Sequence, residues 1–132
     1  MTDTIPDNLA KLIEADQAPL ERLGITFVRA EPGIVILAMT VEDSMTNSHG
    51  NCHGGFLFAL ADTAFAYVLA DESRPPATLQ ASISFTSAAR LGETVKAMAS
   101  ISRSGRRAGF AEVRLNGADD RLIAHFQGAG IR

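Results

Sequence analysis

The stretch HGNCHGGFLFALADTAFAYVLA, residues 49–70, decides the fold of this chain. It joins a turn rich in histidine and glycine to a run without proline, in which only Asp62, Thr63 and Tyr67 carry a polar side-chain atom. A run of this length that is apolar on every side is typical of a buried helix. The rest of the chain must therefore cover this helix.

Asp62 lies well inside the predicted helix, so it is not available to cap the helix start. A solitary carboxylate in apolar surroundings destabilises the fold unless it is paired or hydrogen-bonded. Either an arginine from elsewhere in the chain forms a structural ion pair with Asp62, or the charge serves chemistry. We favour the second interpretation, because charges kept in such surroundings cluster at functional sites.

The start of the helix offers a second functional group. Gly54 and Gly55 are expected to present unpaired N–H groups at the positive end of the helix dipole, which can hold an anion or polarise a carbonyl oxygen. Gly54 and Asp62 are eight residues apart, which is roughly 12 Å along a helix, so one small reacting group cannot touch both. If both act on it, they come from different subunits, and the sequence predicts a two-fold dimer with two equivalent sites.

The other elements follow from periodicity and turn residues. A short helix is expected over residues 7–17, capped by Asp7 and ending before Pro19, with one further turn at residues 20–23. Two strands, residues 25–30 and 34–41, form a hairpin, and a polar connection at 71–76 follows the central helix. Alternating apolar residues predict four more strands in an antiparallel meander with one apolar face, at about residues 78–86, 95–101, 111–115 and 122–126.

Composition narrows the class of protein. A chain of 132 residues is expected to form one domain, residues 1–132. The net charge of −3 argues against nucleic acid as a partner. The single cysteine allows no intrachain disulfide, and neither a signal peptide nor a membrane span is expected, so we predict a cytoplasmic protein.

The segment NSHGNCHGG (residues 47–55), followed by LF at 57–58 and LADTAFAY at 60–67, resembles the signature of the PaaI group of hotdog-fold acyl-CoA thioesterases. The resemblance implies an α+β hotdog fold, in which an antiparallel sheet of about five to six strands wraps around one long central helix. It also implies hydrolysis of an acyl-CoA, with phenylacetyl-CoA or a related aryl or medium-chain thioester as the leading substrate, without metal or redox cofactor. A homodimer would form the active sites, and the family commonly doubles it into a homotetramer.

The same resemblance implies roles for individual residues. The Gly54 amide would polarise the thioester carbonyl, and Asp62 of the facing subunit would act as nucleophile or general base. Asn47 would orient substrate or water, and Thr78 would position water beside the carboxylate. Without the family, these two are an ordinary turn asparagine and a strand threonine. We expect His53 to orient the turn.

Coenzyme A carries phosphates, which arginine binds well. Candidates for this contact are the helix-start Gly55 and four arginines, of which the last three could equally be a solvated hairpin tip: Arg90, Arg103, Arg106 and Arg107. The chain has SAAR at residues 87–90 where relatives often show an Arg-Pro pair, so the placement of coenzyme A stays open.

Three other interpretations stay open. His49, Cys52 and His53 could hold zinc, although their spacing matches no common finger, and Cys52 could be a nucleophile rather than a small buried side chain. A hotdog enoyl-CoA hydratase or dehydratase would share the fold, but it usually needs a histidine near the carboxylate of the helix. A non-catalytic acyl-CoA sensor would bind without turnover.

Overall fold

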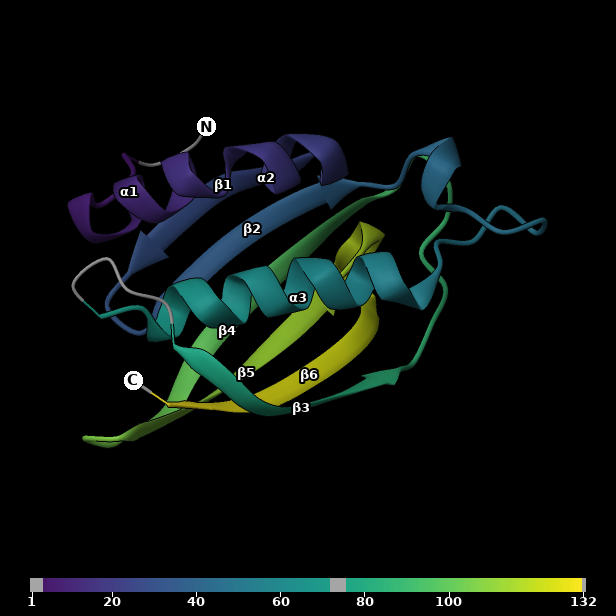
Figure 1. Cartoon of the computed structure of the whole chain (residues 1–132). Coiled ribbons are helices and arrows are strands. Elements are labelled where there is room, and N and C mark those ends of the chain that lie inside the picture. The colour runs from purple at the N-terminus through teal and green to yellow at the C-terminus, as the bar shows by residue number, and fades with distance from the viewer. Residues whose placement is uncertain (1–3, 72–75, 132) are drawn as a thin grey trace.

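Helix α3 (Gly54–Leu69) lies across the inner face of one curved antiparallel sheet (Figure 1). The computed structural model describes residues 4–71 and 76–131, so most of the predicted connection 71–76 lies outside the described residues. The remaining elements, in chain order, are α1 (Asp7–Ala15), α2 (Gln17–Leu23), β1 (Ile25–Glu31), β2 (Ile34–Thr40), the short 3-10 helix η1 (Asp43–Met45), β3 (Ala77–Phe85), β4 (Thr94–Ser104), β5 (Ala108–Asn116), the 3-10 helix η2 (Ala118–Asp120) and β6 (Leu122–Ile131).

The strand order is β1-β2-β4-β5-β6-β3, and every neighbouring pair is antiparallel. The predicted hairpin of β1 and β2 is confirmed, and so is the meander of β4, β5 and β6. The prediction that β3 precedes β4 in that meander is wrong, because β3 pairs with β6 at the edge. Burial agrees with this order: Val95, Ala97 and Ala99 of the central strand β4 are fully buried, whereas most of the edge strand β3 is exposed.

The sheet buries one side of α3 and leaves the other partly open. Its buried side includes Leu60, Ala61, Ala64 and Phe65, all without exposed surface, and Phe65 packs against Phe126 of β6 with ring centroids 5.5 Å apart. The expectation that α3 is buried all round is wrong for one stripe. The residues of this open stripe are exposed or only partly buried, because a single sheet covers a single side of a helix. The stripe consists of Gly55, Ala59, Asp62, Ala66 and the C-cap residue Ala70, and the partly buried Phe56, Phe58 and Thr63 flank it.

The N-terminal helices lie along the β1–β2 end of the sheet (Figure 1). The predicted cap was wrong: Pro6 is the N-cap of α1, and Asp7 is already helical with no capping hydrogen bond. Pro19 does not prevent α2, because it lies in the first turn, where the backbone N–H has no helical partner to lose. The joint between these helices is tied to α3 by the Tyr67 hydroxyl, which donates to Asp16 Oδ2 at 2.7 Å.

Candidate active site

The loop before α3 is folded around Asn47. Its side-chain Oδ1 accepts hydrogen bonds from the backbone N–H groups of His49 (2.9 Å) and Asn51 (3.2 Å), and Gly50 takes the left-handed backbone conformation that closes the turn. The ordinary role of a turn asparagine is therefore observed for the Asn47 oxygen. No hydrogen bond within the described ranges uses its Nδ2 group, which leaves that donor for a ligand.

The segment after β3 holds this loop in place from the side. The Cys52 N–H donates to the Ala89 carbonyl at 2.7 Å, and the Leu91 N–H donates to the Gly50 carbonyl at 3.0 Å. The His53 N–H donates to the Met45 carbonyl at 2.8 Å. The start of α3 is thus fixed by three backbone contacts before the helix begins.

Two backbone amide groups at the start of α3 are free to bind a carbonyl oxygen. His53 is the N-cap, with an exposed side chain that makes no capping bond, and its carbonyl already accepts from the Phe56 N–H at 3.1 Å. The N–H groups of Gly54 and Gly55 have no acceptor among the residues that the structure describes. Unpaired donors at the positive end of a helix dipole favour a carbonyl oxygen that gains negative charge.

Asp62 lies in the middle of the open stripe of α3, half-buried. Within residues 4–71 and 76–131 it forms no ion pair or hydrogen bond, and burial raises the pKa of its carboxyl group above the ordinary value. No arginine of the described chain forms the structural ion pair that was the alternative interpretation. A partly desolvated, unpaired carboxylate is a stronger base than one in water.

One chain brings together only part of the predicted site. Asn47 and Gly54 lie at the N-terminal end of α3, and Arg90 is close to them because it bridges Asn51. Asp62 lies roughly 12 Å further along the helix axis. Thr78 is exposed on the edge strand β3, opposite Gly130.

The other predicted arginines also lie away from Gly54. The turn between β4 and β5 lies at the end of the sheet far from the start of α3 (Figure 1). Arg106 and Arg107 lie in this turn and Arg103 lies at the end of β4, and all three side chains are exposed. The chain alone therefore does not bring these arginines together with Gly54.

Cys52 is buried, as the simpler interpretation of this residue predicts. Burial raises the pKa of its thiol to about 11, and the Sγ–H group contacts the His53 carbonyl oxygen at 3.4 Å. A thiol in this state is mostly protonated at neutral pH and is a poor nucleophile.

Sequence reasoning missed a cavity of about 440 Å³ beside Gly54. Phe85, the last residue of β3, points the end of its ring at the Gly54 Cα, so that a Cβ at this position would lie 2.8 Å from the Phe85 Cζ atom. The cavity is lined by Cys52, Gly54, Leu57, Phe85, Ser87 and Ala88, among others. The sequence signal was Phe85 itself, an aromatic side chain at the end of a predicted strand.

Sequence reasoning also missed the pair that fixes the segment behind this cavity. The Glu93 carboxylate accepts from the Arg90 N–H (3.0 Å) and the Ala118 N–H (2.8 Å) and pairs with Arg121 at 2.9 Å. Arg121 also donates to Ser87 Oγ at 3.2 Å and the Ala88 carbonyl at 2.9 Å. Two lining residues of the cavity are therefore held by the Glu93–Arg121 pair.

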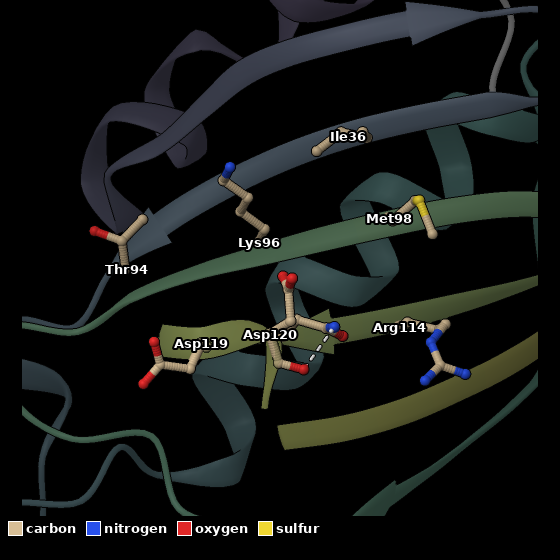
Figure 2. A pocket seen from close by; sticks show the side chains of 9 residues that line it. Ile36, Thr94, Lys96, Met98, Arg114, Asp119 and Asp120 are labelled. Carbon is tan, nitrogen blue, oxygen red and sulfur yellow. Dashed lines mark hydrogen bonds between the residues drawn. The ribbon is translucent and has the colours of Figure 1, made fainter. Parts of the chain in front are cut away.

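A different hollow, of about 380 Å³, lies on the outer face of the sheet, away from α3 (Figure 2). Figure 2 shows Lys96 and Met98 on β4 and Arg114 on β5, with the carboxylates of Asp119 and Asp120 at its rim. Its charges balance, and it shares no lining residue with the cavity at Gly54.

Among the described residues, no group of three or more His, Cys, Asp or Glu side chains is placed to hold a metal ion. In the same part of the chain, no helix has the length and apolar character needed to cross a membrane.

Comparison with known proteins places this fold and its helix-centred site among the thioester hydrolases. The Thioesterase superfamily model matches residues 49–124, which include all of α3 and strands β3 to β5. The chain therefore belongs to the thioesterase superfamily, and the expected hotdog fold and the resemblance to PaaI are confirmed.

Individual relatives are similar over most of their length. The acyl-coenzyme A thioesterase PaaI of Escherichia coli is 32% identical over 117 residues, 89% of this chain and 84% of the relative. The solved structure of E. coli PaaI, from the phenylacetic acid degradation operon, superposes with a TM-score of 0.85 at 31% identity, covering 93% and 94% of the two chains.

Two further relatives extend the comparison. Human acyl-coenzyme A thioesterase 13 is 36% identical over 103 residues, 76% of this chain and 74% of the relative. A Streptococcus mutans protein solved with acetyl-CoA bound has a TM-score of 0.75 at 26% identity, covering 82% and 88% of the chains.

Proposed function

We propose that this protein hydrolyses an acyl-CoA thioester to the free acid and coenzyme A. The observation that carries the proposal is the pair of groups on α3: amides without an acceptor at Gly54 and Gly55, and an unpaired, half-buried carboxylate at Asp62. The first can polarise the thioester carbonyl, and the second can act on the carbonyl carbon or on water. The names of the relatives support the same substrate class.

The site is completed in a homodimer under this proposal. The open stripe of α3 is lined mainly by glycine and alanine, so two copies of the helix can approach closely and antiparallel. That arrangement brings Asp62 of the partner subunit toward Gly54. Within one helix the two residues are roughly 12 Å apart, so they cannot act on the same small group. The same two-fold symmetry would bring Thr78, on the exposed edge of β3, and the arginines near the β4–β5 turn toward the partner's site.

In the proposed reaction the thioester oxygen accepts a hydrogen bond from the Gly54 amide, while Asp62 of the partner subunit either attacks the carbonyl carbon or removes a proton from an attacking water. The carbon–sulfur bond then breaks, and coenzyme A leaves as a thiolate that takes up a proton. Direct attack gives an acyl-carboxylate anhydride, which water hydrolyses. The free Nδ2 group of Asn47 and the Thr78 hydroxyl orient the substrate and the water, and the His53 backbone fixes the turn.

The finer assignments are part of the proposal. PaaI comes from a phenylacetic acid degradation operon in E. coli, which supports phenylacetyl-CoA or a related aryl or medium-chain thioester as substrate. The coenzyme A phosphates would contact Gly55 and the exposed arginines Arg90, Arg103, Arg106 and Arg107. A cytoplasmic homotetramer that needs no metal or redox cofactor completes the proposal.

The test is release of free thiol from arylacetyl-, aroyl- and straight-chain acyl-CoAs by the wild type and by Asp62→Asn, with the exposed Asp43→Asn as the matched control. We expect turnover by the wild type and the control, and a roughly 10²- to 10⁴-fold lower kcat for Asp62→Asn while its oligomeric state is unchanged. Binding without release by the wild type would favour a sensor. Equal activity of Asp62→Asn would exclude the proposed role of the carboxylate. Solvent ¹⁸O in the Asp62 carboxylate after one turnover would distinguish direct attack from general-base catalysis.

A further inference from the structure

The ring of Phe85 occupies the space in front of Gly54. The distances from a Cβ built on Gly54 would be 2.8 Å to Phe85 Cζ and 3.3 Å to both Cε atoms, so the ring meets the helix start end-on. Gly54 does not need glycine for its backbone conformation, because its φ is not positive. The close approach of the ring is therefore the packing reason for a glycine at this position.

The walls of the adjacent cavity differ in size and in freedom to move. Of the described residues that line it, only Leu57 and Phe85 carry large apolar side chains. Leu57 is 3% exposed and fixed in the core, whereas Phe85 is 52% exposed at the end of an edge strand. The remaining walls, such as Cys52, Ser87 and Ala88, are short. The width of the cavity beside the Gly54 amide is therefore set mainly by the position of one aromatic ring.

We propose that Phe85 is a specificity-determining residue, which limits the bulk of the group attached to the carbonyl carbon that Gly54 polarises. This inference rests on the proposed thioester hydrolysis. A carbonyl oxygen on the Gly54 N–H brings its carbon and the first acyl carbon to the cavity mouth, within reach of the ring. Acyl groups that are unbranched at the carbon next to the carbonyl fit beside the ring, and those with an extra methyl group there meet it.

The experiment compares pairs of substrates that differ only in this branching: butyryl-CoA with isobutyryl-CoA, and phenylacetyl-CoA with 2-phenylpropionyl-CoA. The measured quantity is the ratio of kcat/KM for the branched to the unbranched member of each pair. For Phe85→Ala we expect the ratio to rise about tenfold or more, the usual effect of one methyl group on a fitted apolar pocket. The matched control is Phe110→Ala, which removes the same ring from a 42% exposed position on β5, away from the cavity, and leaves the ratio unchanged.

A second variant tests the same geometry from the other side. Gly54→Ala keeps the backbone N–H but places a methyl group against the ring, so the ring must swing away, and we expect this variant also to raise the ratio. In the double variant Gly54→Ala/Phe85→Ala the two effects should not add, because both displace the same ring. Additive effects would show that the contact between residue 54 and the Phe85 ring is not the cause of the change in the ratio.

The outcomes separate this inference from the function on which it rests. A wild type that releases no thiol from these pairs, nor from the arylacetyl-, aroyl- and straight-chain acyl-CoAs of the first test, overturns the proposed hydrolysis and the inference with it. A wild type that is active, with a ratio that stays within twofold in Phe85→Ala, overturns the inference alone, even where kcat falls equally for both members of a pair. The predicted rise in the ratio supports both.

Discussion

Replacing Glu93 is the sharpest test of how the candidate site is held together. The Glu93 side chain is only 9% exposed, and its carboxylate is bound by two backbone amides, those of Arg90 and Ala118, and by the Arg121 guanidinium. These contacts join the segment after β3 to the turn between β5 and β6. Glu93 is therefore a partly buried acceptor shared by three donors from two separate parts of the chain.

The two partners of this pair should differ in their effect on stability. Glu93→Ala leaves the Arg90 and Ala118 amides without their acceptor, and we expect a loss of about 3 kcal/mol in the free energy of unfolding, since hydrogen bonds to a charged group contribute about 1.5–3 kcal/mol and do not add fully. Arg121→Ala leaves the carboxylate with both amides, and Arg121 is 41% exposed, so we expect a loss of only about 1 kcal/mol.

Chemical denaturation of the two variants measures these losses. The matched control is the exposed pair Arg29–Glu31, 2.9 Å apart, whose side chains are 54% and 43% exposed. Glu31→Ala should change stability by less than about 0.5 kcal/mol. If Glu93→Ala cost no more than Glu31→Ala, or less than Arg121→Ala, the amide contacts would not hold the segment, and the reasoning would be refuted.

The pH dependence of stability tests the role of Glu93 independently, because its direction follows from the shift of the Glu93 pKa. Burial alone would raise the pKa of Glu93, but the bonds from Arg90, Ala118 and Arg121, with the charge of Arg121, outweigh it and hold the pKa below its ordinary value of 4.5. The folded state then binds this proton more weakly than the unfolded state. The stabilisation is complete above pH 4.5 and is lost as the pH falls through the folded-state pKa, so the stability gap between wild type and Glu93→Gln should narrow in that range.

Other predictions follow from single residues. Asp62→Asn should lose activity but be at least as stable as the wild type in denaturation at pH 7. Burial raises the pKa of Asp62, so the protonated carboxyl group favours folding below the ordinary pKa of 3.8. This stabilisation is lost as the pH rises through the folded-state pKa, and it is absent at pH 7. Cys52, with a pKa of about 11, should react with iodoacetamide at pH 8 at least about 100-fold more slowly in the folded protein than in denaturant, as followed by mass spectrometry. Gly117→Ala should destabilise the fold by about 1–3 kcal/mol in denaturation, and less in a Glu93→Ala background, because the new methyl group would overlap the Glu93 carboxylate.

The sequence predicted which segments form helices and strands better than it predicted which strands lie next to each other in the sheet. The central helix, the first hairpin and the order β4-β5-β6 follow from periodicity and short turns, which are local properties. The edge position of β3 depends on which strands can be buried on both sides, and alternation along one strand carries no information about that. The first helix ends before Pro19 as predicted, but α2 begins at Gln17 instead of residue 20, because a proline in the first turn of a helix has no helical hydrogen bond to lose.

For the site, the sequence identified the residues that carry chemistry and missed those that shape it. Gly54 and Asp62 are conspicuous because a glycine pair and a lone carboxylate are unusual in an apolar run. Phe85 and Glu93 look ordinary in the sequence, and their importance comes from contacts with residues more than 20 positions away, Gly54 and Ala118. Such contacts become visible only when the segments are placed side by side.

The composition of the open stripe of α3 bears on both the assembly of the protein and the basicity of Asp62. A helix that met only one sheet would be expected to have polar residues on its far side, yet four of the five stripe residues are glycine or alanine and the fifth is Asp62. If a second copy covers the stripe, as proposed, water leaves the surroundings of Asp62 and its pKa rises further, while the partner's helix start brings positive potential that opposes the rise. The strength of the base then depends on how closely the two helices approach. Enlarging the stripe with Ala66→Leu should therefore weaken the dimer and shift the acid limb of the pH–rate profile together, and a shift in one without the other would separate assembly from catalysis.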